Sequence, residues 1–261
     1  MQPACPRARG TAPRPLRRAH WGLLLLAPLA SAGNLQVAPI LLEFSDGVQA
    51  QALWLENNGD QPLHAQVRVQ HWTQSDAADV LEPSQMLLAR PAIVQIGPGQ
   101  RQLVRVLRPA PVPTGDPQEQ AYRLLVDELP APHVKPNQGL NFLLRYSIPA
   151  FVLPAGASPR ELGSKAATDT SGLHARWQLD PGLLTLTVHN TGAQRVRLSQ
   201  LRWLPENGPP IELTPGLLGY VLAGQHMQWT LPLPHPFPLT GTLQARLNDA
   251  AIPQPLRSAD L

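Results

Sequence analysis

The sequence predicts an all-β protein made of two immunoglobulin-like β-sandwich domains. Short segments in which apolar and polar residues alternate recur along the chain, each bounded by Gly, Pro, Asn or Asp. This is the pattern of an antiparallel sandwich. The chain also holds 31 prolines and 19 glycines, and no long stretch has apolar residues spaced three and four apart, as an amphipathic helix requires.

Residues 1–32 have the three parts of a secretory signal peptide. Five arginines and no acidic residue precede the apolar run WGLLLLAPLA. After the run, Ala30-Ser31-Ala32 has the small-x-small form of a cleavage site. The apolar run is too short to span a bilayer as a helix. We therefore expect cleavage after Ala32, export, and no membrane insertion of the mature chain.

Without this leader the charge of the chain changes sign. The whole sequence has 21 Lys and Arg against 18 Asp and Glu; subtracting the five leader arginines leaves 16 against 18, a net charge near −2. Nucleic-acid binding needs a clustered basic face, so we expect no nucleic-acid partner. The one cysteine, Cys5, lies in the leader, so the mature chain must depend on a buried core rather than on disulfides.

The first domain is expected over residues 33–154. Each of its strands is an alternating segment between turn residues. In order along the chain, they lie in NLQVAPILLEF (interrupted at Pro39), in QAQALWLENNGDQPLHAQVRVQHW (two strands around Asn58-Gly59), in RPAIVQIGPGQRQLVRVLR (two strands around Gly97-Pro98-Gly99), in QAYRLLVDELP, and in NQGLNFLLRYSIPAF.

The second domain is expected over residues 155–261. The segment LLTLTVHNTGAQRVRLSQLRW repeats the order of strand, Asn-x-Gly turn, strand and closing Trp that is found in the first domain, so that Trp203 corresponds to Trp72. A single weak repeat indicates two related sandwiches, because a solenoid would need several copies. The small and polar residues of LPAGASPRELGSKAATDTSG mark the boundary.

The segment NQGLNFLLRYSIPAF carries an unusual strand. One face is apolar and the other is mixed, with a proline near the end, and proline favours an edge strand because it has no amide hydrogen. A long apolar edge is an aggregation hazard, so we expect that the free protein can hide it by self-association. The residues of the apolar face are Leu140, Phe142, Leu144, Tyr146 and Ile148.

The sequence carries no catalytic motif that we can recognise, neither a Gly-x-Ser-x-Gly elbow nor a His-Glu-x-x-His pair nor a phosphate-binding glycine loop. The adjacent acids Asp127 and Glu128 would point to opposite faces of a strand. Seven histidines follow the leader without metal-ligand spacing. We therefore expect no enzyme activity, no cofactor and no metal site; the histidines are His64, His71, His133, His174, His189, His226 and His235.

Two arginines are candidates for binding a carboxylate. Arg123 and Arg145 are expected on neighbouring strands of one sheet, and a guanidinium can hold a carboxylate with two hydrogen bonds. The alternative is that both are solvated edge charges or partners of a nearby aspartate.

These features resemble the periplasmic chaperones of the chaperone–usher pathway, which assemble pili. The resemblance is carried by QAYRLLVDELP followed by LNFLLRYSIPAF, by Asn57-Asn58-Gly59, by LLARPAIVQIGPGQRQLVRVLR and by Leu247-Asn248-Asp249. The YR and RYSIP sequences resemble the archaic branch of this family. The resemblance to this family implies a chaperone without enzymatic activity that binds pilin subunits and delivers them to an outer-membrane usher.

In this family, the last long strand of the first domain completes the unfinished fold of a pilin subunit, a form of β-augmentation called donor-strand complementation. The resemblance assigns that role to the apolar face from Leu140 to Ile148. The alternative reading is that these residues face the protein's own core.

The resemblance also implies two ionic sites, and the sequence departs from both. Where many relatives hold the pilin carboxylate with an Arg and a Lys, this chain has Leu41 and Pro149, so we expect Arg123, with Arg145 second, to be the anchor. An interdomain contact is expected at Glu128 and Asp249, although its usual arginine is replaced by Leu153.

A protein of another class, an immunoglobulin-like structural fimbrial subunit or adhesin, is the alternative to a chaperone. Such a subunit would lack part of its own fold or carry a detachable N-terminal extension. Residues 33–45 are expected to form an integral first strand, which favours the chaperone.

Overall fold

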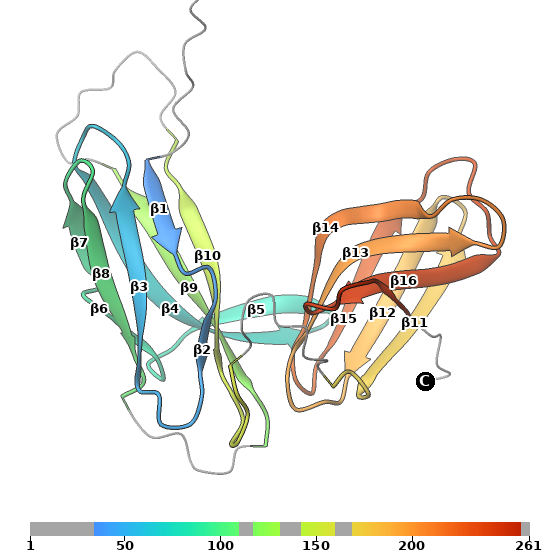
Figure 1. Cartoon of the computed structure of the whole chain (residues 1–261), viewed down its shortest axis with the longest axis horizontal. Helices are drawn as coiled ribbons and strands as arrows, with labels where there is room; N and C mark the ends of the chain where they lie inside the picture. The colour runs from blue at the N-terminus through green and yellow to red at the C-terminus, as the bar shows by residue number, and fades with distance from the viewer. Residues whose placement is uncertain (1–33, 110–116, 131–141, 160–168, 257–261) are drawn as a thin grey trace, which may run out of the picture. The chain divides into compact units, whose positions relative to one another are not determined.

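Figure 1 shows the computed structural model of the chain, which describes residues 34–109, 117–130, 142–159 and 169–256. These residues belong to one compact unit, residues 33–261. Their regular structure is made of strands, and none of the described residues is helical. The prediction of an all-β fold with two sandwiches is confirmed.

The first sandwich packs two sheets against each other. One sheet has the order β1-β3-β8-β6, formed by Leu35–Ala38, Ala50–Asn57, Arg101–Leu107 and Leu88–Arg90. The other has the order β2-β10-β9-β4-β5, with β7 also paired to β4; these strands are Leu42–Phe44, Arg145–Val152, Gln120–Leu129, Leu63–Ser75, Ala78–Pro83 and Ile93–Ile96.

Alternation places one side of each sheet in the core. Leu53 and Leu55 of β3 and Val104 and Val106 of β8 are fully buried, since residues two apart on a strand share a face. The expected break at Pro39 is where the chain passes from one sheet to the other, because β1 pairs with β3 and β2 pairs with β10.

The second sandwich is built in the same way from a three-stranded and a four-stranded sheet. The first has the order β11-β12-β15, formed by Leu173–Asp180, Leu183–Asn190 and His226–Pro232. The second has the order β14-β13-β16-β17, formed by Ile211–Val221, Val196–Pro205, Gly241–Leu247 and Gln254–Pro255. Trp203 is fully buried in its core, and its ring meets that of Trp177 edge-on at 5.3 Å.

The repeated Asn-x-Gly turn has the same hydrogen bonds in both sandwiches. The Asn57 side chain accepts a hydrogen bond from the Gly59 N–H and donates to the carbonyl of Gln61. Asn190 accepts from the Gly192 N–H and donates to the carbonyl of Gln194. The weak sequence repeat therefore marks one structural device that is used twice, a buried Asn that closes the turn between two strands.

The hairpin between β4 and β5 was not predicted. Its two turn residues, Asp76 and Ala77, have φ of 51° and 58°, the left-handed conformation of a two-residue hairpin turn. Glycine usually follows Asp or Asn in such a turn, and Ala77 in its place removed the sequence signal.

Candidate functional site

The edge of the sheet at β10 is only partly covered by another strand. On one side, β10 pairs with β9 along its whole length, from Arg145 to Val152. On the other side, β2 pairs only with Ala150–Val152. Among the described residues, the outer edge of β10 from residue 145 to residue 148 therefore has no strand partner.

The backbone groups at this edge follow from the pairing with β9. The Glu128 N–H donates to the Leu144 carbonyl at 2.9 Å, and backbone groups alternate between the two sides of a strand. Arg145, Ser147 and Pro149 consequently turn their backbone groups toward the outer edge. Pro149 has no N–H, and the parallel pairing of Ala150 with Leu42 directs the Pro149 carbonyl to β2. The free edge therefore offers the amides and the carbonyls of Arg145 and Ser147.

The residues of the predicted apolar face differ in how far they are buried. Leu140 lies outside the described residues. Phe142 is 72% exposed and precedes the start of β10, whereas Ile148 is 3% exposed and belongs to the core of the first sandwich. Leu144 and Tyr146 lie between these extremes, half-buried against that core.

The regular strand in the segment NQGLNFLLRYSIPAF is shorter than expected, because β10 begins only at Arg145. The Tyr146 hydroxyl donates to the Leu35 carbonyl of β1, so this side chain is engaged within its own sandwich. Ile148 faces the same core as Ala150 and Val152, two and four residues further on, because all three share one face of the strand. For Ile148 the alternative reading, that it faces the protein's own core, describes this structure.

Arg123 and Arg145 lie on neighbouring strands of one sheet, as expected, but they do not form a pair. In the register of β9 and β10, Arg145 lies opposite Asp127 and Arg123 lies opposite Pro149, so the two arginines are four positions apart, about 13 Å along the strand. They must be considered as separate sites.

Arg145 is bound to an aspartate. Its Nε donates to Asp127, and Arg68 of β4 donates to the same carboxylate at 2.7 Å. Burial alone would raise the pKa of Asp127, but the hydrogen bonds from Arg145 and Arg68 outweigh burial and hold that pKa below its ordinary value. The Arg145 side chain, although 65% exposed, is thus already paired with an anion.

Arg123 has a different environment. Its guanidinium stacks on Trp72, with Cζ 3.7 Å from the ring centroid, and lies 5.8 Å from the ring of Tyr220. Burial lowers the pKa of Arg123, while the nearby Asp79 and Tyr220 act in the opposite direction. Among the described residues no side chain forms an ion pair with it.

A cluster of aromatic residues joins the two sandwiches beside Arg123. Trp72, Phe151 and Leu153 of the first sandwich are buried together with Leu222 of the second, and Tyr220 packs against them. The Gln74 side chain fixes this contact: its Nε2 donates to the Tyr220 carbonyl at 2.8 Å, and its Oε1 accepts from the Leu222 N–H at 2.9 Å.

The ionic contact between the sandwiches was expected at Glu128 and Asp249, but each of these acts within its own sandwich. Glu128 accepts a hydrogen bond from the Leu144 N–H, and Asp249 pairs with Arg197. The end of β9 that borders the second sandwich is the other one, beside Glu119, whose carboxylate pairs with Arg195. Nine residues of extended strand place Glu128 about 30 Å from Glu119. Among the described residues, no hydrogen bond or ion pair joins Glu128 to the second sandwich or Asp249 to the first.

A buried group that sequence reasoning missed makes the ionic contact instead. Arg195, just before β13, pairs with Glu43 of β2 and Glu119 next to β9, and its Cζ lies 3.5 Å from the Phe151 ring. The three charged side chains are 5% exposed or less. The one available sequence signal was Glu43, a charge within the apolar run ILLEF.

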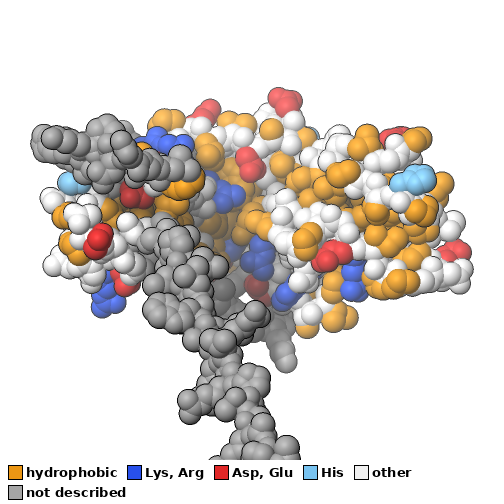
Figure 2. All heavy atoms as spheres, turned by 90° about the horizontal axis from the view of Figure 1, so that it is seen from above, with side chains coloured by type: hydrophobic (Ala, Val, Ile, Leu, Met, Phe, Trp, Pro, Cys, Tyr) orange, Lys and Arg blue, Asp and Glu red, His pale blue; other side chains and the backbone are white. Residues whose placement is uncertain are grey.

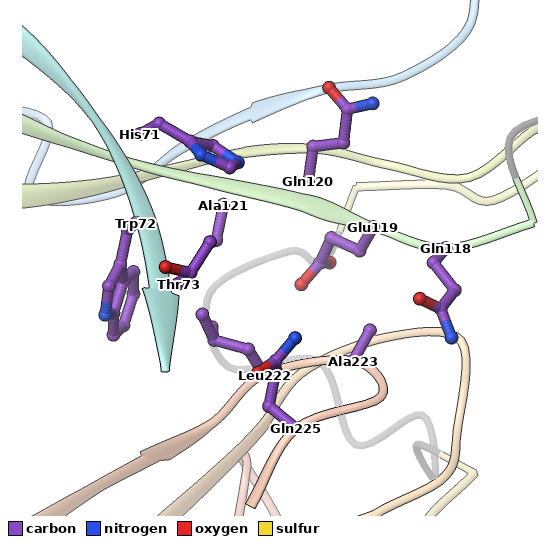
Figure 3. Close-up of a pocket in the computed structure, with 10 residues that line it drawn as sticks. All are labelled: His71, Trp72, Thr73, Gln118, Glu119, Gln120, Ala121, Leu222, Ala223 and Gln225. Atoms are coloured by element: carbon purple, nitrogen blue, oxygen red, sulfur yellow. The ribbon is translucent and has the colours of Figure 1, made fainter. Parts of the chain in front are cut away.

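A pocket of about 220 Å³ lies next to this contact (Figure 3). Trp72 and Ala121 from the first sandwich and Leu222 from the second contribute apolar walls, and amide side chains supply much of the polar lining. Figure 3 shows the carboxylate of Glu119 pointing toward the loop that carries Leu222 and Ala223. The remaining lining residues are His71, Thr73, Gln118, Gln120 and Gln225.

The space-filling view gives the character of one face of the molecule. Hydrophobic side chains gather there in patches, with basic and acidic side chains interspersed among them (Figure 2). Apolar patches bordered by charges are typical of surfaces that bind other proteins. Within the described ranges, no three His, Cys, Asp or Glu side chains are grouped to hold a metal ion, and no helix long and apolar enough to cross a membrane is found.

Comparison with known proteins identifies the first sandwich. Residues 34–158 match the family model of the PapD N-terminal domain, described as a pili and flagellar-assembly chaperone. The matched residues include β9 with Arg123, β10, and the apolar positions from Leu140 to Ile148. No curated protein sequence matches the chain.

Several solved structures share the fold. A chain of the CsuC–CsuE chaperone–tip adhesion subunit pre-assembly complex, from the archaic chaperone-usher Csu pili of Acinetobacter baumannii, matches with TM-score 0.60 and 23% identity over 85% of this chain and 96% of that one. A chain of the Salmonella enterica SafA pilin–SafB chaperone complex matches with TM-score 0.56 and 17% identity, covering 87% and 96%. The Pseudomonas aeruginosa CupB2 chaperone matches with TM-score 0.52 and 16% identity, covering 84% and 97%.

Proposed function

We propose that this chain, whose residues 34–158 match the PapD N-terminal domain of pili and flagellar-assembly chaperones, is itself a chaperone of that family. It would bind pilin subunits in the periplasm by adding the open edge of β10 to their unfinished fold. Residues 1–32 would direct its export and be removed. The subunit would then pass to an outer-membrane usher. Two observations together carry the proposal. The first is the family match, and the second is a strand edge, residues 145–148, beside which the described part of the chain places no strand.

The backbone provides the first part of the binding. A subunit strand placed beside β10 could pair with the outward amides of Arg145 and Ser147 and with the carbonyls next to them, in the manner of β-augmentation. Pro149 ends the stretch that can donate, and β2 covers β10 from Ala150 onward. The pairing is therefore limited to the first half of β10 and the residues before it.

Apolar side chains before β10 provide the second part. Phe142 is 72% exposed and Leu144 is half-buried, and Leu140 has the same parity in the sequence. Burying each such side chain contributes roughly 1.5–3 kcal/mol, so these residues have free energy to offer to a subunit. Ile148 does not, since it is already in the chaperone's own core.

Arg123 provides the third part, the anchor for the subunit's C-terminal carboxylate. It is a half-buried guanidinium next to the uncovered part of β10, opposite Pro149 in the register, and burial disfavours its charge. A carboxylate ligand would compensate for that burial. Arg145 is less suited to this role because its guanidinium is already paired with Asp127.

The alternative of a structural subunit receives less support. A subunit would carry a loose N-terminal extension, whereas β1 pairs with β3 at four residue positions, from Leu35 to Ala38. Its first strand is thus an integral part of the first sandwich.

Co-expression with a pilin-like subunit from the same genome tests the proposal. We expect a soluble one-to-one complex that is lost with Phe142→Asp. The matched control is Leu239→Asp, since Leu239 is 70% exposed but lies in the second sandwich; this variant should retain the complex. Equal recovery of all three complexes would contradict the assignment of the donor segment, and no complex with any subunit, both partners being folded, would favour the structural subunit.

A further inference from the structure

The surroundings of Arg123 include a residue of the second sandwich that sequence reasoning did not connect with it. The Tyr220 ring lies 5.8 Å from the Arg123 Cζ, and it meets the Trp72 ring edge-on at 5.5 Å and 81°. Arg123, Trp72 and Tyr220 therefore form one group drawn from β9, β4 and β14.

Tyr220 is held in this place by its own backbone. The carbonyl of Tyr220 accepts from Gln74 Nε2, and the N–H of Leu222, two residues on, donates to Gln74 Oε1. Both bonds reach from β4 of the first sandwich, two residues beyond Trp72. The Tyr220 side chain is thus fixed relative to the strand that supports Arg123, whereas its hydroxyl plays no part in these bonds.

This group contains two hydrogen-bond donors for which the described residues supply no acceptor. In the described part of the chain, neither the Arg123 guanidinium nor the Tyr220 hydroxyl has a hydrogen-bonded partner. Asp79, the acid whose charge acts on Arg123, is held by other donors: its Oδ1 accepts from Trp72 Nε1 and Gln74 Nε2. A carboxylate has four lone-pair positions and can accept from a guanidinium and a phenol together.

We propose that the anchor for the subunit's terminal carboxylate is shared between the two sandwiches, with Tyr220 as its second donor beside Arg123. This inference rests on the proposed function and extends it, because it gives the second sandwich a direct part in subunit recognition. The Gln74 bridge then serves to place Tyr220 rather than to bind the ligand.

Peptides can separate this proposal from the anchor assignment itself. The probe is a synthetic peptide with the last residues of a pilin-like subunit, made once with a free C-terminal carboxylate and once as the C-terminal amide. Binding of both forms to the mature chain is measured by the change in tryptophan fluorescence. The quantity compared is the preference for the carboxylate, the ratio of the two Kd values.

For the wild type we expect a preference of at least about tenfold, since a hydrogen bond to a charged group contributes more than a neutral one. Tyr220→Phe, which removes only the hydroxyl, should reduce this preference several-fold. Tyr122→Phe is the control, because its hydroxyl bonds to Gln120 within the first sandwich; its preference should equal that of the wild type.

The Arg123→Ala variant distinguishes the two possible failures. If Arg123→Ala loses the preference while Tyr220→Phe keeps it in full, the anchor stands and the shared site is refuted. If the wild type itself binds acid and amide equally, both are refuted. If Tyr220→Phe and Arg123→Ala both lower the preference and Tyr122→Phe does not, the shared site is supported.

Discussion

Replacing Arg195 by alanine is the most informative perturbation of the contact between the sandwiches. The side chains of Arg195, Glu43 and Glu119 are 3%, 5% and 1% exposed, so the Arg195 cation and the two carboxylates paired with it are all buried. The backbone N–H of Arg195 also donates to Glu119 at 3.1 Å. Arg195→Ala would leave both carboxylates buried next to each other without their shared cation.

The size of the effect follows from this burial. Removing one member of a buried ion pair typically costs about 3–5 kcal/mol, and here two pairs lose the same partner. The loss of the contact between Arg195 and the Phe151 ring adds to this. Because a domain is stable by only about 5–15 kcal/mol, we expect Arg195→Ala to lower the free energy of unfolding by at least about 3 kcal/mol.

The assay is urea unfolding of the mature chain, followed by tryptophan fluorescence. The two sandwiches can unfold in separate steps, so the midpoint of each transition is compared. Arg197→Ala is the matched control, since its pair with Asp249 is 31% exposed on both sides and should contribute about 1 kcal/mol or less. A variant at Arg195 as stable as the control would refute this account of the contact.

Two further predictions concern single side chains. Since the pKa of Asp127 is lowered by Arg145 and Arg68, its stabilisation is present above an ordinary pKa of about 3.9 and is lost as the pH falls below it; the stability gap between wild type and Asp127→Asn should therefore shrink from pH 7 to pH 3, and an unchanged gap would contradict this. Asn190→Ala, which removes the donor to the Gln194, Val221 and Leu222 carbonyls, should cost about 2–3 kcal/mol in thermal unfolding, and a cost below about 0.5 kcal/mol would show that these carbonyls find other partners.

The fold could be predicted because its signals are local. Alternation with a period of two marks each strand regardless of what it packs against, and the Asn-x-Gly turns at Asn57 and Asn190 reveal the repeat of the two sandwiches. Where a turn lacked its usual residue, as at Asp76 and Ala77, the hairpin was missed.

The site could be predicted only in part, because its contacts join distant segments. The sequence placed Arg123 and Arg145 on one sheet, but it did not show that Asp127 would bind Arg145 and leave Arg123 to the aromatic cluster. Alternation also cannot tell which core a face belongs to, so Ile148 could not be separated from Phe142. The group of Glu43, Glu119 and Arg195 joins positions up to 152 residues apart, and no local pattern encodes such a meeting.

Hydrogen exchange at the edge of β10 tests the central claim most directly. The backbone amides of Arg145 and Ser147 face the uncovered edge, whereas that of Tyr146 faces β9. In the free chain, Arg145 and Ser147 should exchange much faster than Tyr146. On binding a pilin-like subunit, donor-strand addition predicts that Ser147 slows by about a hundredfold or more. If the subunit binds and Ser147 exchanges as fast as before, the subunit does not pair with this edge, and the account is contradicted.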